Sequence, residues 1–231
     1  MPLANPQLTK FTTASPVLAT FSFQELTSGQ SFLSLFPMRQ EDSSSIKNSL
    51  VSQILISNPL ATGSSAATGS FTKIIDLDFD ALINQNFDIA GNAKVNLVHG
   101  ARSYSPSRTA EYYTIVKVRR WDGSTETDLG SVQTVTHTYA SGAGSNFFSW
   151  KQESLDISLS ESRINTGEFL RVTFEVWAKQ GSNSVNIVIV HDPDNNVTGV
   201  DDNSQFINMT DGGTITWPSK TIINIPLKID I

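Results

Sequence analysis

Apolar and polar residues alternate with a period of two along much of this chain, and no other feature constrains its fold as strongly. In residues 71–82, Ile75, Leu77 and Phe79 alternate with aspartates, and residues 168–179 alternate in the same way. Successive side chains of a β-strand point to opposite faces, so such segments form strands with one buried face and one solvent face. The pattern predicts an all-β protein.

Further segments show alternation or a short apolar run bounded by turn residues. They are residues 94–99, 112–121, 127–139, 147–159, 185–191 and 222–231. Residues 122–124, Asp-Gly-Ser, predict a turn and therefore a hairpin between the strands on either side. Residues 180–184 predict a second hairpin, in which 185–191 runs back along 168–179.

The last predicted strand, residues 222–231, places five apolar residues on one face and ends on the last of them. Pro226 removes one backbone donor, so this strand is expected at a sheet edge or with a bulge there. About eight to ten strands without a long helix favour an antiparallel β-sandwich of the jelly-roll type.

The first part of the chain has a different pattern from the rest. Residues 1–69 contain two stretches rich in small residues, at 43–45 and 61–69, which are typical of loops. Residues 46–56 fit a strand or a short helix. We therefore divide the chain into an N-terminal arm with edge strands at 1–69 and a jelly-roll β-sandwich at 70–231. The alternative is that the first part belongs to the sandwich and carries long loops.

The composition argues against several classes of function. Charged residues make up 16% of the 231 residues, against roughly 25% in a typical domain, and the formal net charge is −6. Nucleic-acid binding needs a surplus of Lys and Arg, so we expect no nucleic-acid partner. The absence of cysteine excludes disulfides and thiolate metal sites. We also expect no secretion signal in the first residues and no membrane span, because no apolar run is long enough.

Residues 191–196, His-Asp-Pro-Asp-Asn-Asn, are the clearest metal candidate in the sequence. Calcium takes oxygen ligands from loops of this composition, which makes Asp192, Asp194 and Asn196 candidate calcium ligands. The loop departs from the EF-hand pattern at Val197, where that motif needs glycine. A turn in which Asp and Asn side chains accept backbone hydrogen bonds explains the segment equally well. We therefore expect no cofactor, with calcium as the alternative.

Other candidate sites have ordinary structural explanations. Asp76, Asp78 and Asp80 form the solvent face of their predicted strand, and the alternative is a cation site or a contact with a basic partner. No nucleophile elbow is present, and carboxylate pairs of the glycosidase type have no fixed spacing to search for. The histidines lack metal-ligand spacing, and each is expected to be a strand or turn residue: His99, His137 and His191.

Two features of the sequence point to partners. Residues 94–120 contain six basic residues and one acidic residue, whereas residues 192–211 contain five acidic residues and no basic one. Opposite patches can pair between copies of a chain in an array, and the alternative is two solvated regions. Six aromatic residues provide either a sugar-stacking surface or a cover for the core: Tyr104, Tyr112, Tyr113, Trp121, Trp150 and Trp177.

Four segments together resemble a known group of proteins. They are residues 21–29 (FSFQELTSG), 113–123 (YTIVKVRRWDG), 167–178 (GEFLRVTFEVWA) and 188–193 (VIVHDP). In this order, over residues 21–193, they resemble jelly-roll virion structural proteins of tailed bacteriophages, a group that includes capsid decoration and minor capsid proteins. The shared motifs are strand and turn patterns, and none of them is a catalytic signature.

The resemblance implies a non-enzymatic protein of the virion, made in the host cytoplasm. It would act as a decoration, or cement, protein that binds the major capsid protein or other virion proteins and stabilises the head. Self-association is expected with it, with a trimer as one option. The alternative is a receptor- or carbohydrate-binding module of a tail or head fibre, and a polysaccharide-degrading enzyme is a third hypothesis.

Overall fold

All regular structure in the described part of the chain is β-structure, which confirms the all-β prediction. The computed structural model describes residues 30–42, 45–52, 61–65, 67–103, 105–141, 147–181, 185–191 and 221–228. Thirteen strands lie in these ranges, and they include no helix. Among these residues there is accordingly no helix long and apolar enough to cross a membrane.

The strands are numbered in chain order. They are β1 (Gln30–Asp42), β2 (Ser45–Val51), β3 (Ala61–Ser65), β4 (Ala67–Thr68), β5 (Thr72–Leu82), β6 (Phe87–Ser103), β7 (Thr109–Trp121), β8 (Glu126–Gln133), β9 (His137–Ala140), β10 (Phe147–Ile164), β11 (Phe169–Gln180), β12 (Val185–Val190) and β13 (Ile222–Lys228).

Hydrogen bonds join the strands into one mixed sheet. Its order is β3-β12-β6-β13-β1-β2-β5-β11-β7-β8, with β10 also on β6, β4 on β11 and β9 on β7. Most neighbours are antiparallel, as expected, but β4 runs parallel to β11 and β2 runs parallel to β5. The prediction of a wholly antiparallel sheet is therefore wrong at these two short pairings. The jelly-roll type of sandwich stays a prediction.

Strand β1 connects two halves of this sheet. One half runs from β3 to β13 and includes β10, and the other runs from β2 to β8 and includes β4 and β9. Its first part, from Gln30 to Leu35, pairs with β13, and its second part, from Phe36 to Asp42, pairs with β2. A single apolar cluster draws its residues from both halves, including Leu97 of β6 and Val172 of β11. The two halves therefore bury their apolar faces in one common core.

The two halves also approach closely where β8 meets β10. A Cβ atom built on Gly130 would lie 2.4 Å from the backbone oxygen of Ser158 and 3.0 Å from side-chain atoms of Ile157 and Leu159. A distance of 2.4 Å to a backbone atom is below any van der Waals contact. Gly130 is therefore required for this close packing of β8 on β10.

The described residues before residue 70 pair directly with strands from the rest of the chain. Strand β1 pairs with β13, and β3 pairs with β12. The stretch at 61–69, expected as a loop, contains β3 and β4, because its backbone completes the edges of β12 and β11. Residues 46–56, left open between strand and helix, begin as the strand β2. Residues 1–29 lie outside the described residues, so the N-terminal arm and the division at residue 69 stay predictions.

One of the two predicted hairpins is present and the other is wrong. Strands β7 and β8 pair across the predicted turn, in which Asp122 Oδ1 accepts hydrogen bonds from the backbone N–H groups of Ser124 (2.8 Å) and Thr125 (2.7 Å). Gly123 has φ 97°, a conformation that suits glycine. Strands β11 and β12, in contrast, do not pair. Both edges of β11 are occupied by β5 and β7, and β12 pairs with β3 and β6.

The C-terminal strand confirms the expectation for Pro226. Strand β13 pairs with β1 on one side and with β6 on the other, and its pairing with β6 shifts register between Asn224 and Leu227. The proline therefore lies at a bulge and not at a sheet edge. Ile223, Ile225 and Leu227 are buried, as the alternation predicts.

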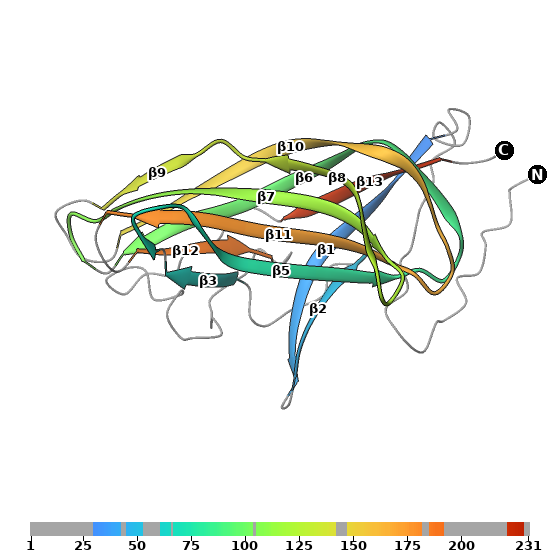
Figure 1. Ribbon diagram of the computed structural model, residues 1–231, viewed down its shortest axis with the longest axis horizontal. Coiled ribbons are helices and arrows are strands. Elements are labelled where there is room, and N and C mark those ends of the chain that lie inside the picture. Colours follow the sequence, from blue (N-terminus) through green and yellow to red (C-terminus); the bar gives the residue numbers. More distant parts are fainter. Residues whose placement is uncertain are drawn as a thin grey trace, which may run out of the picture.

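The β1–β2 ribbon leaves the common direction of the other strands. Figure 1 shows the long strands running along the long axis of the molecule, while β1 and β2 extend together beyond the body. The ribbon is a regular antiparallel pair from Phe36↔Val51 to Asp42↔Ser45. Residues 43 and 44, which join the two strands, lie outside the described ranges.

Candidate functional site

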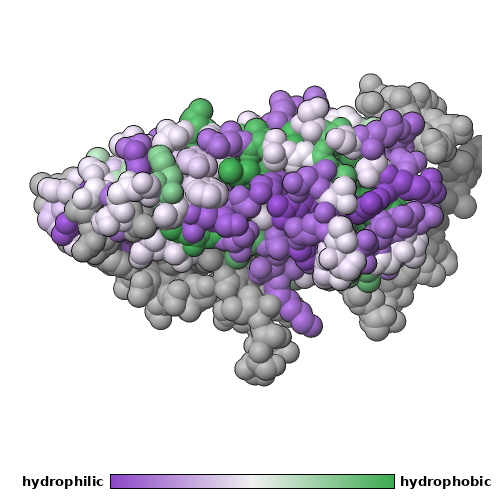
Figure 2. Space-filling model, viewed as in Figure 1, coloured by the Kyte–Doolittle hydropathy of each residue, from purple (hydrophilic) through white to green (hydrophobic). Residues whose placement is uncertain are grey.

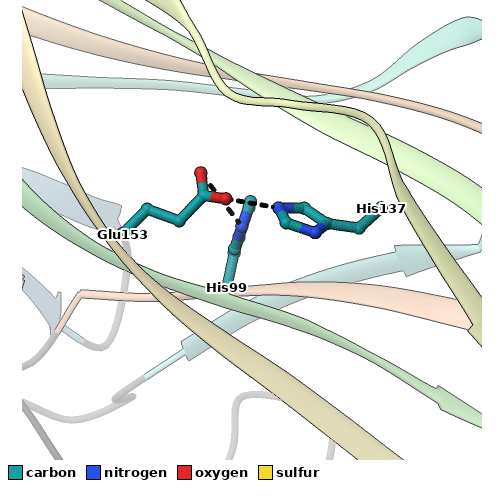
Figure 3. Close-up of side chains that lie close together, drawn as sticks. All are labelled: His99, His137 and Glu153. Carbon is teal, nitrogen blue, oxygen red and sulfur yellow. Dashed lines mark ion pairs between the residues drawn. The ribbon is translucent and has the colours of Figure 1, made fainter.

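Three side chains with metal-ligating atoms meet at the edge of the core. His99 comes from β6, His137 from β9 and Glu153 from β10, and Figure 3 shows them pointing toward one another. The His137 Nε2 atom lies 2.6 Å from Glu153 Oε1, and His99 Nε2 lies 3.9 Å from Glu153 Oε2. The two imidazole rings are perpendicular, with centroids 5.0 Å apart. We call these three residues the His–Glu cluster.

Strand register brings the cluster together. Glu153 lies opposite Leu97 in the β10–β6 pair, so it shares the inward face with His99, two residues further along β6. His137 lies opposite Tyr112, a core residue of β7. One imidazole and the carboxylate therefore come from one half of the sheet, and the second imidazole comes from the other half.

The surroundings of His99 keep its imidazole neutral. The residue is 0% exposed, and this burial, together with the neighbouring charge of His137, lowers the pKa of His99 to about 3. Its Nδ1 lies 2.8 Å from Thr114 Oγ1. If Nδ1 donates to this hydroxyl, the Nε2 atom carries a lone pair directed into the cluster. Tyr112 packs edge-on against His99. Burial, and to a smaller extent the charge of Glu153, raises the pKa of the Tyr112 phenol.

The cluster contains buried polar atoms without hydrogen bonds. His99 Nε2, His137 Nε2 and Glu153 Oε2 have no hydrogen-bond partner in the described part of the chain. The 2.6 Å contact between His137 and Glu153 is close enough for a hydrogen bond but lacks the geometry of one. Buried polar atoms are normally satisfied, so this site differs from an ordinary structural network.

The sequence does not identify this cluster. The sequence pattern predicts that the three histidines are ordinary strand or turn residues, and it does not distinguish Glu153 from other carboxylates. No spacing motif connects positions 99, 137 and 153. The sequence indicates only that two histidines and a glutamate occupy inward-facing positions of predicted strands. The candidate calcium ligands Asp192, Asp194 and Asn196 lie outside the described residues, so that site stays a prediction.

The outer face of β5, β11, β7 and β8 carries a network of ion pairs. Arg171 of β11 makes two hydrogen bonds to Asp80, of 2.7 and 2.8 Å, lies 3.3 Å from Asp78, and also contacts Glu126. Asp76 pairs with Lys73 at 2.5 Å. The aspartate trio thus has cationic partners within the chain, which favours the solvent-face interpretation. Figure 2 shows a largely hydrophilic face, with hydrophobic residues in small separate areas.

Glu175 is the most buried carboxylate of this network. It is 6% exposed, its Oε1 accepts a 2.7 Å hydrogen bond from Lys117, and Lys73 lies 3.5 Å away. Burial acts to raise the pKa of Glu175, but the hydrogen bond and charge of Lys117 outweigh it and hold the pKa below its usual range. The ionised form is therefore stabilised by folding.

The pH dependence of stability should report this carboxylate. A depressed folded-state pKa adds stability above the unfolded pKa, about 4.3 for Glu, and this stability is lost as pH falls through the folded value. At pH 7, Glu175→Gln should lower the free energy of unfolding by about 1.5–3 kcal/mol, the worth of a hydrogen bond to a charged group. At pH 3 the difference should shrink. Urea unfolding at both pH values measures it, and Glu161→Gln, on the exposed face of β10, should change little at either pH.

Most of the basic residues in 94–120 also have partners within the chain. Lys94 pairs with Asp156 at 2.9 Å, and Arg119 pairs with Asp128 at 2.7 Å and with Glu126 at 2.8 Å. Arg102 is buried. The basic segment is thus not a continuous free patch. The acidic segment at 192–211 lies outside the described residues, so pairing of the two segments between copies stays a prediction.

The aromatic residues divide between the core and the surface. Tyr112 is buried in the core, whereas Tyr113 and Trp177 stack on the outer face with ring centroids 6.3 Å apart. Phe71 extends this row, 5.1 Å from Tyr113. Beside the row lies an open hollow of about 420 Å³ lined in part by Lys179, whose ammonium group lies over the Phe71 ring. Tyr104 lies outside the described residues.

Comparisons with known proteins do not place the chain in a family. No family model and no curated protein matches it. An aminopeptidase from a marine sediment Thaumarchaeota archaeon matches with a TM-score of 0.49 at 8% identity, over 87% of this chain and 37% of the other. A CocE/NonD family hydrolase from Staphylococcus aureus matches with a TM-score of 0.42 at 8% identity, over 84% and 36%.

A viral structure is also among the similar ones. The infectious bursal disease virus Gx strain structure matches with a TM-score of 0.28 at 11% identity, over 85% of this chain and 42% of that one. The chain thus spans about two fifths of the length of the solved structures it resembles. Because all three TM-scores are below 0.5 and the neighbours differ in kind, these likenesses identify neither a family nor a function.

Proposed function

We propose that this protein is a non-enzymatic structural component of a virus particle, namely a decoration protein that binds the major capsid protein of a tailed bacteriophage and stabilises the head. The resemblance of residues 21–193 to such proteins supports the proposal. The wholly β framework of the described residues is consistent with it. The observation that carries the proposal is the β1–β2 ribbon, because it gives the body a means of reaching a neighbouring subunit.

The ribbon offers unpaired strand edges for such a contact. From Phe36 to Asp42, β1 pairs only with β2 among the described strands, and β2 meets β5 only at Ser49↔Asp80. An unpaired edge presents backbone N–H and C=O groups to which another chain can add as a strand. In an isolated protein such an edge promotes aggregation, whereas in a particle a partner subunit covers it.

Repeated copies would make weak ribbon contacts effective. A single ribbon contact would be weak by itself, but a lattice presents the same contact many times. Self-association of the chain, with a trimer as one option, would link several ribbons, and linked contacts bind more tightly than single ones because the later ones form within the same complex. The protein would thereby connect capsid subunits without catalysing a reaction.

Shortening the ribbon tests this function. Met38 and Ser49 are partners in the ladder, so they can be joined by Asn-Gly, a sequence that forms two-residue hairpin turns, in place of residues 39–48. The shortened protein should fold but bind particles at least about tenfold more weakly, a loss of about 1.4 kcal/mol. Co-sedimentation with phage particles that lack the chain measures the binding. Particles without bound protein should also rupture at a lower temperature.

A full-length ribbon with the same turn is the matched control. It carries Asn-Gly in place of residues 43 and 44 and should bind as the unmodified protein does. Equal binding of the shortened and full-length ribbons would remove the ribbon from the proposal. If the chain is absent from purified particles of the virus that encodes it, the decoration role is wrong.

A carbohydrate-binding module is the second candidate, favoured by the aromatic row on the outer face. Stacked Tyr113 and Trp177 lie near the hollow that Lys179 and Glu111 line, and Lys179 and Glu111 pair at 3.1 Å. Aromatic rings beside polar groups are the common means of binding sugars at a surface. Glycan-array binding that disappears in Trp177→Ala would favour this candidate, and an array without binding would exclude it.

A further inference from the structure

The His–Glu cluster combines features that its role in the fold does not explain. Apart from Thr114, the buried side chains on inward-facing positions of β6, β7 and β10 around it are largely apolar, including Leu97, Ala101 and Tyr112. Placing two imidazoles and a carboxylate among them costs free energy unless their polar atoms find partners. Yet an imidazole nitrogen of each histidine and one carboxylate oxygen have no hydrogen bond.

A metal cation would satisfy these atoms together. The ligand atoms of His99, His137 and Glu153 lie within 4.8 Å of one another. In a tetrahedral zinc site with bonds of about 2.0–2.1 Å, neighbouring ligand atoms are about 3.3 Å apart. The contacts of 2.6 Å to Oε1 and 3.9 Å to Oε2 lie on either side of this value and no pair exceeds 4.8 Å, so side-chain movements of about 1 Å bring the three ligands to zinc geometry.

The hydrogen bond made by the His99 ring suits this residue to be a metal ligand. Metal-binding histidines commonly donate the proton of the second ring nitrogen to a neighbouring oxygen, which orients the ring and raises its basicity. Thr114 Oγ1 lies 2.8 Å from His99 Nδ1 and is in a position to accept this proton.

The donor set selects the class of metal. Two imidazole nitrogens and one carboxylate oxygen favour zinc and neighbouring first-row transition metals, whereas calcium takes oxygen ligands. Within the described ranges no fourth His, Cys, Asp or Glu joins the group. His137 and Glu153 have 12% and 17% of their side chains exposed, so the site lies near the surface although its unpaired ligand atoms are buried. Three protein ligands with one open position form a recognised zinc arrangement.

We propose that His99, His137 and Glu153 bind one zinc ion, which joins β9 of one half of the sheet to β6 and β10 of the other. Bound zinc stabilises the folded state by mass action, because the three ligands are far apart in the unfolded chain. When free zinc is about a hundred times its dissociation constant, the melting temperature should rise by about 5–10 °C. The inference does not depend on the particle role proposed above.

Zinc titration of the full chain tests the site. After removal of metal with a chelator, isothermal titration with zinc chloride should show one bound equivalent. Glu153→Gln and His137→Gln should each weaken binding about tenfold or more, which cuts the rise in melting temperature at the same zinc concentration by about half or more. Glu161→Gln, a carboxylate of the same strand that pairs with Lys228 on the surface, is the matched control and should bind as the unmodified chain does.

Each other outcome overturns the proposal. Failure of the folded chain to bind zinc in molar excess would show that the cluster is not a zinc site. Unchanged binding by a folded double variant, Glu153→Gln with His137→Gln, would place the ion elsewhere in the chain. Displacement of zinc by a modest excess of calcium would indicate an oxygen-only site. Circular dichroism confirms the fold of each variant, and the nearly isosteric Glu153→Gln keeps the test decisive if His137→Gln fails to fold.

Discussion

Phe174→Ala should lower the free energy of unfolding by about 3–5 kcal/mol, the range for large aromatic truncations in a core. Phe174 is 1% exposed and lies on β11, the strand held between β5 and β7. Its ring meets Phe79 edge to face, with centroids 5.7 Å apart. Removal of the ring leaves a cavity that neighbouring strands cannot close, because both edges of β11 are hydrogen-bonded. Urea unfolding followed by circular dichroism measures the loss.

Two comparisons make this result interpretable. Phe169, on the same strand, packs against Trp121 and is only partly buried, so Phe169→Ala should cost clearly less. A double-mutant cycle between Phe79 and Phe174 should give a coupling of about 0.5–1.5 kcal/mol for the aromatic pair. A cost below about 1 kcal/mol for Phe174→Ala would contradict a common core between the two halves of the sheet.

Arg171→Met should have the second largest effect, a loss of about 2–4 kcal/mol. Arg171 is 12% exposed in its side chain, makes two hydrogen bonds to Asp80, and lies over the Trp121 ring with its guanidinium carbon 4.2 Å from the centroid. The hydrogen bond with Asp80 raises the pKa of Arg171 above its usual value. Methionine keeps much of the apolar stem but leaves Asp78, Asp80 and Glu126 without their shared cation. Removing one partner of a partly buried pair costs more than the pair itself contributes.

Salt concentration separates the electrostatic part of this loss from packing. The repulsion among the carboxylates that Arg171 bridges is screened as salt is added, so the defect of Arg171→Met should decrease between low and high sodium chloride. Arg163→Met is the matched control. Arg163 is 58% exposed and lies 3.7 Å from Asp88, so its loss should cost less than about 1 kcal/mol. If the two variants were equally stable, the network would contribute nothing beyond ordinary surface pairs.

The segments with the clearest alternation were predicted best. Residues 71–82, 112–121 and 168–179 are strands at nearly the predicted bounds, with the expected buried faces. Strand β1 was not predicted, because its alternation is short and Pro37 interrupts it. The proline is accommodated because β1 has no second described neighbour from Phe36 on. Strands β3 and β4 consist of small residues, a composition typical of loops. They are strands because their backbone pairs with β12 and β11, and their side chains do not indicate this.

The sequence alone therefore determined which side chains face the core of the predicted strands, because that depends on local backbone geometry with a period of two. The tertiary structure alone decided which strands are neighbours. Every strand edge offers the same backbone donors and acceptors, so the sequence did not reveal that β11 and β12 belong to different halves. The His–Glu cluster follows from those pairings. His99, His137 and Glu153 meet only because β10 pairs with β6, β9 pairs with β7, and the two pairs face each other across one core.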